Sequence, residues 1–353
     1  MTHWERIMQN YRQPFITIGI ASYNYAKYLT EAFEAIKRQK FKDFEILYAD
    51  DGSTDESVSV IESFITENPN MMIRLIAGDN IGLFGNKQRL IDNARGKYLM
   101  LCDADDWMND DCLETLAKAA LRTDADRIVS EIRNIDGDKG KIMYVQSFSK
   151  NPSKWCETLH HGALYKLSVI RDNQIKMPDS LPDDFSFITQ FNLYAQSTLF
   201  VRKSLYNWRL HSASESHRNW ENNPYRGITL LKKMAYIIQK LDNQCQNNLT
   251  KQDIENINLL LLKHYYFYCI KDISSMGSQK KAISEYEEMR RIMTSSFPEY
   301  KKSLFKRGIK KSPFRPKVHL IMTVLGMLET VYLFFPMLRI YGVIMRLAHR
   351  HSL

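Results

Sequence analysis

The chain has 353 residues, 44% of them hydrophobic and 25% charged, a composition typical of a folded protein with room for one catalytic domain and a further segment. Its five cysteines are odd in number and form no C-x-x-C pair, which argues against a disulfide framework and a structural zinc site and favours a reducing compartment. No long apolar run follows the first residues, so no secretory signal peptide is expected.

The net charge of +9 comes from the C-terminal end of the chain. Residues 301–353 hold six Lys, five Arg and a single acid, Glu329, whereas the first 300 residues have no positive excess. A near-neutral first part followed by a basic, apolar tail favours an anionic membrane surface as partner. A nucleic acid is not expected, because no basic stripe interleaved with aromatic residues occurs in the first part.

Apolar runs alternate with periodic helical patterns through the first 120 residues. The predicted strands are 15–21, 44–49, 72–77 and 98–102, and the predicted helices are 29–39, 54–66, 85–94 and 112–121. This alternation predicts an α/β fold with a mainly parallel sheet that is covered on both faces.

The pattern changes after about residue 126. Residues 128–135 and 141–145 flank a turn rich in Gly and Asp and resemble a hairpin, and residues 226–293 show helical periodicity. We therefore expect a catalytic domain at 1–220, a helical region at 221–300 and a basic, apolar tail at 301–353.

A cluster of carboxylates, Asp103-Ala104-Asp105-Asp106, directly follows the predicted strand 98–102. Open α/β sheets bind their ligands at this edge, and carboxylates that repel one another there favour Mg²⁺ or Mn²⁺ with a substrate diphosphate. The alternative is an acidic loop before a helix cap at Asp110 or Asp111.

Two further polar segments follow the first two strands. Ala21-Ser22-Tyr23-Asn24-Tyr25 and Asp50-Asp51-Gly52-Ser53-Thr54-Asp55 lie at the same edge, where an aromatic ring can stack on a base and a carboxylate can accept from a base N–H. The alternative for the second segment is a turn plus a helix cap at Ser53 or Thr54.

Five short motifs occur in a fixed order: Tyr23-Asn24, Asp50 to Ser53, Asn80-Ile81-Gly82, Gly96-Lys97-Tyr98 and Asp103 to Asp106. From about residue 14 to 215 the chain thereby resembles the family 2 glycosyltransferases, inverting enzymes of bacterial polysaccharide or glycolipid synthesis. The resemblance implies a GT-A fold, with a Rossmann-like, mainly parallel sheet, and a nucleotide-sugar donor. It also implies that about 14–125 bind the donor and about 126–220 the acceptor.

The resemblance also implies roles for residues that bind the donor. Asp51 would recognise the base, with Tyr23 lining the base pocket and Ala21 at its edge. Asp103 would lie near the ribose with Ala104 beside it, and Asp105, together with Asp103, would reach the divalent metal at the diphosphate. Lys87 stands where the family often has Arg, so it would keep the charge toward the diphosphate without the bidentate fork.

The general base of the family is the second acid of a pair at the start of a helix. Pro182-Asp183-Asp184-Phe185 fits this pattern, and Asp184 is the expected base, although a pair of acids at a helix N-terminus is also favoured by the macrodipole. His161, Asp183, Arg209 and His211 are expected near the acceptor or diphosphate, with His217 as a further candidate.

The tail contains 21 residues, 318–338, with one charge, Glu329, after a run of Lys and Arg. A helix hairpin in or partly in the membrane plane is favoured over a spanning helix, and a buried helical pair or an oligomer contact is a third reading. Attachment to the cytoplasmic face of the cell membrane would place the site beside lipid-linked acceptors.

These features together predict a metal-dependent inverting glycosyltransferase that uses a UDP-linked sugar and extends a membrane-associated glycan. One alternative is a polyprenyl-phosphate glycosyltransferase, whose acceptor is already ionised and needs no base. Another is an inactive scaffold with the same fold, against which Asp103, Asp105 and Asp184 argue. A dehydrogenase is not expected, because no G-x-G-x-x-G follows the first strand.

Overall fold

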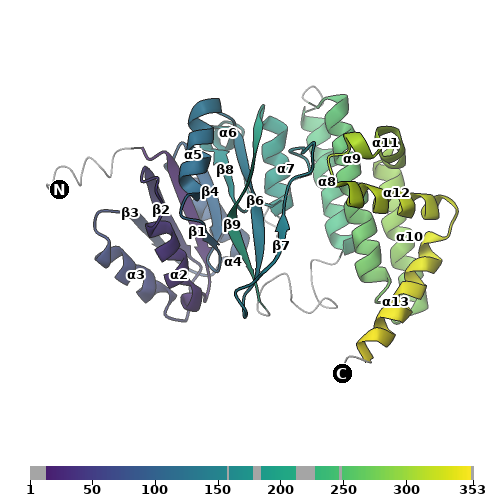
Figure 1. Cartoon of the computed structure of the whole chain (residues 1–353), viewed down its shortest axis with the longest axis horizontal. Coiled ribbons are helices and arrows are strands. Elements are labelled where there is room, and N and C mark those ends of the chain that lie inside the picture. Colours follow the sequence, from purple (N-terminus) through teal and green to yellow (C-terminus); the bar gives the residue numbers. More distant parts are fainter. Residues whose placement is uncertain (1–12, 157–158, 178–183, 212–226, 246–248, 351–353) are drawn as a thin grey trace. The chain divides into compact units, whose positions relative to one another are not determined.

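The computed structural model describes residues 13–156, 159–177, 184–211, 227–245 and 249–350. These residues form two compact units, which we call the sheet unit (within 1–147 and 159–212) and the helical unit (within 148–158 and 213–353) (Figure 1). The helical unit thus includes parts of both the expected helical region and the expected tail, together with a short segment from the middle of the chain.

The sheet unit is built on one nine-stranded sheet with the order β3-β2-β1-β4-β8-β6-β9-β5, and β7 pairs with β6. Strands β3, β2, β1 and β4 are parallel, whereas β8 runs antiparallel to both β4 and β6. The strands are β1 Ile16–Ser22, β2 Phe44–Asp50, β3 Met72–Ala77, β4 Tyr98–Asp103, β5 Trp107–Met108, β6 Arg127–Asp136, β7 Ile142–Gln146, β8 Ala163–Lys166 and β9 Thr198–Leu210.

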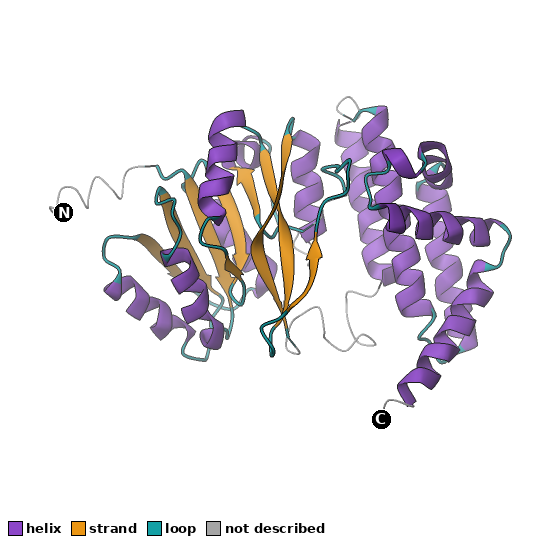
Figure 2. Ribbon diagram, viewed as in Figure 1, coloured by secondary structure: helices purple, strands orange, loops and turns teal. Residues whose placement is uncertain are grey.

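Helices cover both faces of this sheet (Figure 2). Ile18, Ile46 and Met100 share one hydrophobic core with residues of α2, α3 and α5. On the opposite face α4 packs closely, since a Cβ on Gly19 would lie 3.3 Å from Leu90. The helices are α2 Ala26–Lys37, α3 Ser57–Glu67, α4 Gly82–Asn93, α5 Cys112–Thr123, α6 Leu167–Asp172 and α7 Asp184–Tyr194.

The expected α/β fold is confirmed, and the predicted strands lie within about a residue of β1 to β4. β1, β2 and β4 are buried on both faces, whereas β3 at the edge of the sheet is only partly buried. The sheet is parallel in its first half and mixed in its second. Apolar periodicity predicts neither β8, which has four residues, nor β9, whose polar and charged residues break the apolar run. The segment from His160 to Tyr165, which overlaps β8, does resemble an acceptor-side strand of the family. Both strands are held by long-range pairing to β6 rather than by local propensity.

The helical unit contains the remaining described helices. Thr250 caps α9 with a capping box, because its hydroxyl accepts from the Asp253 N–H while the Asp253 carboxylate accepts from the Thr250 N–H. The elements are α8 Gly227–Cys245, α9 Lys251–Tyr268, the π-helical η3 Cys269–Ile273, α10 Gln279–Ser296, α11 Tyr300–Arg307, the 3₁₀ turn η4 Ile309–Lys311, α12 Pro316–Thr330 and α13 Phe334–Arg350.

The segment 148–156 packs within this unit. Trp155 Nε1 donates to Asp253 Oδ1 at 2.6 Å, and Asn151 Nδ2 donates to the Lys310 carbonyl at 2.9 Å. Among the described residues no single helix has the length and apolarity of a membrane span. Residues 316–330 and 334–342 have that length and apolarity only when they are taken together, and the chain bends by 115° at the break between them.

Candidate active site

The carboxyl ends of three neighbouring strands bring the sequence motifs together. In the sheet register Ala21 of β1 pairs with Asp103 of β4, and Ser22 pairs with Asp50 of β2. Asp51 continues this edge, since its N–H donates to the Ser22 carbonyl at 2.9 Å. The expected convergence of the first, second and fourth strand ends is therefore present in the structure.

The loop after β2 is shaped by its own side chains. Asp50 Oδ2 accepts from the Ser53 N–H at 2.8 Å, and Gly52 has φ +73°, a left-handed conformation that suits glycine. Asp51 is buried, and its Oδ1 accepts from the Ile81 N–H at 2.8 Å. Neither Ser53 nor Thr54 caps α3, which begins at Ser57, so the helix-cap alternative for this motif is wrong.

Asn24 links the first two strand ends. It adopts φ 58°, and its Oδ1 accepts from the Thr54 N–H at 2.7 Å while its own N–H donates to Ser53 Oγ at 2.9 Å. Tyr23 beside it is 44% exposed, whereas Ala21 is buried. The Tyr-Asn motif therefore combines a structural Asn with an aromatic ring that is open to a ligand.

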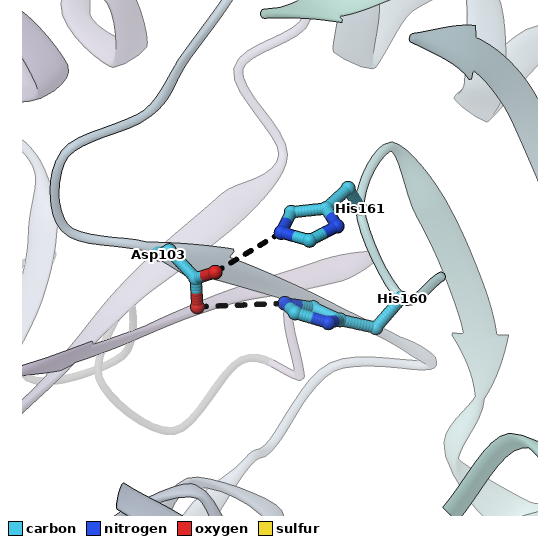
Figure 3. A group of neighbouring side chains, drawn as sticks. All are labelled: Asp103, His160 and His161. Atoms are coloured by element: carbon cyan, nitrogen blue, oxygen red, sulfur yellow. Dashed lines mark hydrogen bonds and ion pairs between the residues drawn. The ribbon is translucent and has the colours of Figure 1, made fainter. Parts of the chain in front are cut away.

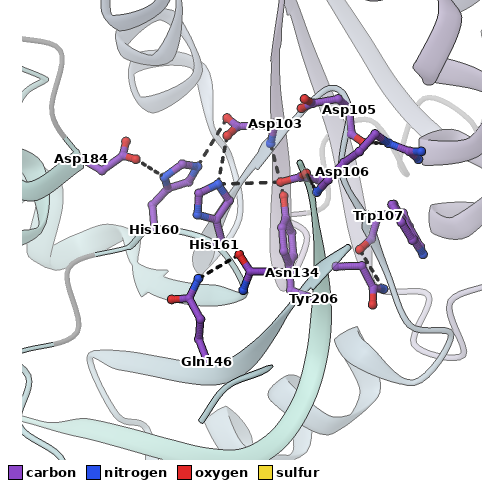
Figure 4. Close-up of polar contacts among 12 residues, drawn as sticks. Asp103, Asp105, Asp106, Trp107, Asn134, Gln146, His160, His161, Asp184 and Tyr206 are labelled. Atoms are coloured by element: carbon purple, nitrogen blue, oxygen red, sulfur yellow. Dashed lines mark hydrogen bonds and ion pairs between the residues drawn. The ribbon is translucent and has the colours of Figure 1, made fainter. Parts of the chain in front are cut away.

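Lys87 lies at the centre of a buried ionic cluster. Its Nζ is 3.2 Å from Asp103 Oδ1, 3.3 Å from Asp184 Oδ1 and 3.4 Å from His160 Nε2. His160 Nδ1 lies 2.7 Å from Asp184 Oδ2 (Figure 4). The cluster thus joins an expected donor residue, Asp103, to the expected base, Asp184, through a lysine and a histidine.

The helices that carry these groups are fixed by packing. Asn86 Nδ2 donates to the Ala49 carbonyl at 2.8 Å and holds α4 against the end of β2. Phe187 and Phe191 of α7 contact the ring of Tyr165 in β8, with centroids 5.3 and 5.0 Å apart. Asp184 is the first residue of α7, as the sequence pattern predicted, and this packing aims it at the strand ends.

Electrostatics favour the charged forms in this cluster. Burial alone would raise the pKa of Asp103 and Asp184, but attraction to Lys87 and His160 outweighs it and lowers both pKa values. Burial would likewise lower the pKa of Lys87, and the two carboxylates raise it above its usual value instead. Burial would lower the pKa of His160, but attraction to Asp184 and Asp103 together outweighs it and raises this pKa.

The pKa values of Asp105 and Asp106 are shifted in the opposite direction. Burial, with repulsion from Asp103, raises the pKa of Asp105, and burial with repulsion from Asp105 and Asp103 raises that of Asp106 further. Asp105 Oδ2 lies 2.9 Å from His211 Nε2, and Asp106 Oδ1 accepts from the Arg209 N–H at 2.8 Å. Negative charge at this end of the motif is thus less compensated than at Asp103.

Asp103, His160 and His161 form a group whose ligand atoms lie within 4.8 Å of one another (Figure 3). His161 Nε2 is 3.0 Å from Asp103 Oδ2, and its ring stacks on Trp208 with centroids 4.9 Å apart. The Lys87 ammonium lies against two members of this group, so a cation already meets their charge. This group suits a metal less well than its residue types alone indicate.

Asp105 and His211 fit a divalent metal better. A carboxylate and an imidazole are a donor pair that suits Mn²⁺, and a bound cation would offset the burial and the repulsion from Asp103 that raise the pKa of Asp105. Within the described residues no lysine or arginine ion pair is formed by Asp105, in contrast to Asp103. His211 was expected at the diphosphate, and the structure brings it to the expected metal residue.

Arg209 contacts residues of the loop after β4 and of α2. Its Nε donates to the Asp105 carbonyl at 2.8 Å, its guanidinium lies 4.5 Å from the ring centroid of Trp107, and it forms an ion pair with Glu31. These contacts brace the loop after β4. The structure therefore gives Arg209 a role in holding this loop, and its contact with the diphosphate or the acceptor stays a prediction.

His160 is the residue that sequence reasoning missed. Its neighbour His161 was singled out, and Asp183 and His217 lie outside the described residues. Gly162, with φ +62° and a hypothetical Cβ only 2.6 Å from Ser130 Oγ, makes the tight turn that presents both histidines at the start of β8. The signal was the pair of histidines before such a glycine, at a strand that joins β4 and β6.

Comparisons with known proteins agree with this geometry. Residues 17–192, which run from β1 into α7, match the family described as Glycosyl transferase family 2. EpsH of Bacillus subtilis (strain 168), named as a glycosyltransferase, is 23% identical over 322 residues, covering 86% of this chain and 89% of that protein. Glycosyltransferase GlyA of Streptococcus pneumoniae is 26% identical over 64% of this chain, but this covers only 36% of GlyA.

The fold is similar to a solved structure as well. The crystal structure of residues 1–349 of TarS from S. aureus, in complex with UDP-GlcNAc, has a TM-score of 0.69 and 15% identity and covers 94% of this chain and 92% of that one. TarS is named as a poly(ribitol-phosphate) beta-N-acetylglucosaminyltransferase. With the matched residues spanning the parallel strands, the acidic motif and the first turns of α7, this chain is an enzyme of glycosyltransferase family 2 with a GT-A fold.

Proposed function

We propose that this glycosyltransferase moves a sugar from a UDP-linked donor to a hydroxyl group of a glycan or lipid-linked glycan, with inversion and with the help of a divalent metal. The observation that carries the proposal is the meeting of Lys87, Asp103 and Asp184 at one sheet edge, next to Asp105 and His211. The similarity in fold to TarS bound to UDP-GlcNAc supports the choice of a uridine nucleotide.

The donor would lie along the strand ends. Tyr23, with its exposed ring, would stack on the base, and we assign Asp51 Oδ2 to a base N–H because Oδ1 already accepts from Ile81. Asp103 would contact the ribose, and Ala21 and Ala104, both buried, leave room beside it. Asp105 and His211 would hold Mn²⁺ or Mg²⁺, which when bound neutralises charge that develops on the leaving diphosphate.

Asp184 would act as the general base. It accepts the proton of the acceptor hydroxyl as that oxygen bonds to the anomeric carbon, and the bond from this carbon to the diphosphate oxygen breaks with the electron pair leaving on the nucleoside diphosphate. Attack from the face opposite the leaving group inverts the anomeric configuration. The lowered pKa of Asp184 keeps it ionised and ready to accept a proton at neutral pH.

Lys87 connects donor binding to this base. Its ammonium is shared between Asp103 and Asp184, and diphosphate oxygens would compete for it. Because attraction to Lys87 helps to lower the pKa of Asp184, movement of Lys87 toward the donor would raise that pKa and make Asp184 a stronger base. The base would then gain strength only when a donor is present.

The rival acceptor is a polyprenyl phosphate. Such an acceptor is ionised at neutral pH and needs no base, so the position of Asp184 beside His160 and Lys87 favours a hydroxyl. The two cases differ in the Asp184→Asn variant, which would keep its rate with a phosphate acceptor and lose it with a hydroxyl.

Hydrolysis of a panel of nucleotide sugars, with and without Mn²⁺, tests the proposal. We expect turnover of a UDP-sugar by the wild type, loss of it in excess chelator and in Asp105→Ala, and release of the anomer opposite to that of the donor, measured by NMR. Full activity in chelator would contradict the metal role, and retention of configuration would contradict inversion.

A further inference from the structure

An exposed apolar face lies on α12, in the helical unit. Leu320, Ile321, Val324, Met327 and Val331 are between 48% and 59% exposed, and they recur at three- and four-residue spacing on one side of the helix. Leu333, in the break before α13, is 54% exposed. These six residues, which we call the α12 face, form an exposed apolar stripe at helical spacing, and exposed apolar patches can mark interaction sites.

The opposite side of α12 is fixed by buried polar contacts. Glu329 is 2% exposed and accepts from the hydroxyls of Tyr265 and Tyr266 at 2.9 and 3.1 Å, and its Oε2 lies 3.1 Å from Lys301 Nζ. Tyr300 Oη adds a longer contact at 3.4 Å. A buried carboxylate with this many partners resists rotation of the helix, so the α12 face must point away from the unit.

The helix that follows is also anchored. Arg339 Nη1 donates to the carbonyls of Ile273 at 3.0 Å and Met276 at 2.8 Å. A Cβ on Gly342 would lie 1.8 Å from the Ser274 carbonyl oxygen, so α13 approaches η3 as closely as glycine allows. Both helices of the bent pair are thus part of a folded unit.

The geometry is unsuited to a span. α12 has 15 residues, which gives about 22 Å, less than the roughly 30 Å of a bilayer core. The chain then bends by 115°. A spanning arrangement would also remove Glu329 from its tyrosine and lysine partners and place it in lipid. The α12 face is instead suited to lying in the plane of an interface.

Charge around the α12 face is positive. Lys310, Lys311, Arg315 and Lys317 immediately precede or begin α12 and are exposed. Glu329 is the only acid after residue 300, and it is buried, so this segment presents no exposed carboxylate. A partner that buries an apolar stripe and attracts adjacent cations has an apolar interior beneath an anionic surface.

We propose that the α12 face docks the helical unit in plane onto an anionic lipid bilayer, with residues 310–317 against the headgroups. This inference concerns membrane attachment and does not depend on the donor or acceptor proposed above. The leaflet with this chemistry is the cytoplasmic leaflet of the cell membrane.

Flotation of the full chain with vesicles tests the proposal, using phosphatidylcholine alone or with about a third phosphatidylglycerol. Deletion of 301–353 is unsuitable, because it would remove core residues such as Leu304, Phe334 and Leu338. The test variant is Ile321→Glu with Val324→Glu. Its matched control is Tyr236→Glu with Ile283→Glu, which adds the same charge at exposed apolar positions of α8 and α10 in the same unit.

We expect the wild type and the control to float with anionic vesicles, and the face variant to bind at least about tenfold more weakly, as loss of two apolar contacts predicts. At about 0.5 M salt, binding should fall because the attraction of the cations is screened, and it should persist in part because burial of apolar surface is not screened. Circular dichroism and gel filtration would establish that both variants fold.

Equal flotation of the face variant and the control, or no flotation of the wild type, would overturn the proposal. Equal binding to both vesicle types would overturn the assignment to an anionic surface. A wild type that does not float but forms a dimer, which the face variant disrupts, would instead identify the α12 face as a contact between copies of this chain.

Discussion

Buried carboxylates occur in both units, and their partners differ in a way that separates a functional cluster from a structural one. In the helical unit the Glu329 carboxylate accepts from three tyrosine hydroxyls and forms an ion pair with Lys301. Its hydrogen-bonding capacity and its charge are thus satisfied within the fold. In the sheet unit the acidic motif and Asp184 converge on Lys87 and several histidines.

Charge is unevenly balanced within the cluster of the sheet unit. Lys87 and His160 lower the pKa values of Asp103 and Asp184, whereas Asp105 and Asp106 keep raised pKa values. A fold tolerates such a surplus of negative charge where a cation or substrate completes it. The comparison predicts that changes in the cluster around Lys87 affect catalysis, whereas changes at Glu329 affect the free energy of unfolding.

The largest effect is expected for Asp184→Asn. Loss of the general base should lower kcat by roughly 10²- to 10⁴-fold while the affinity for the donor changes little. Steady-state kinetics with a hydroxyl acceptor and equilibrium binding of the donor would measure both quantities. If Asp183→Asn is inactive instead, or if Asp184→Asn no longer binds donor, the assignment of the base is wrong.

The counterpart in the helical unit is Glu329→Ala. Three tyrosine hydroxyls and Lys301 would lose a buried acceptor, which should reduce the free energy of unfolding of this unit by about 3 kcal/mol. Glu329→Gln, which keeps an acceptor oxygen, should lose less. Urea unfolding followed by tyrosine absorbance would show the difference, and an unchanged midpoint in Glu329→Ala would refute the structural role.

A smaller effect on turnover is expected for His160→Gln. His160 acts through Asp184, to which its Nδ1 is 2.7 Å away, so we expect kcat to fall by about tenfold with a shifted pH profile and donor affinity retained. His161→Gln is the control, since its ring contacts Asp103 and Trp208. A pH profile that His160→Gln leaves unmoved would argue that His160 only fills space.

The pH dependence of stability should show the same cluster. The folded-state pKa of Asp184 lies below its unfolded value, so its contribution to stability is present above about pH 4 and is lost as the pH falls through the folded-state pKa. Asp184→Asn removes this contribution. The difference in unfolding free energy between wild type and variant should therefore shrink as the pH is lowered toward about 3. A difference that stays constant with pH would contradict the ionic role.

Local pattern and register account for what the sequence predicted correctly. Strands β1 to β4 are mainly apolar runs, and the parallel register brings residues at their carboxyl ends together. The meeting of Ala21, Asp51 and Asp103 therefore followed from sequence alone. The position of Asp184 at a helix start was predicted from its acidic pair, and its role as the general base stays a prediction.

Long-range contacts account for what the sequence did not show. His160 reaches Asp184 only because β8 inserts between β4 and β6, and Arg209 meets Glu31 and Trp107 through the pairing of β9 with β5. The partners of Glu329 come from α9 and α11, about 30 to 60 residues away in sequence. A single charge in an apolar run does not indicate which distant residues will contact it. The sequence therefore left spanning, in-plane and buried arrangements of this segment open.

Isothermal titration of UDP in the presence of Mn²⁺ tests the contrast between the clusters most directly, with wild type, Asp105→Ala and Glu329→Gln compared at a temperature where all three are folded. We predict that Asp105→Ala binds at least about tenfold more weakly, as expected when a metal site loses a residue. Glu329→Gln should bind like the wild type although it unfolds more easily. Undiminished binding by Asp105→Ala, or loss of binding by folded Glu329→Gln, would contradict the account.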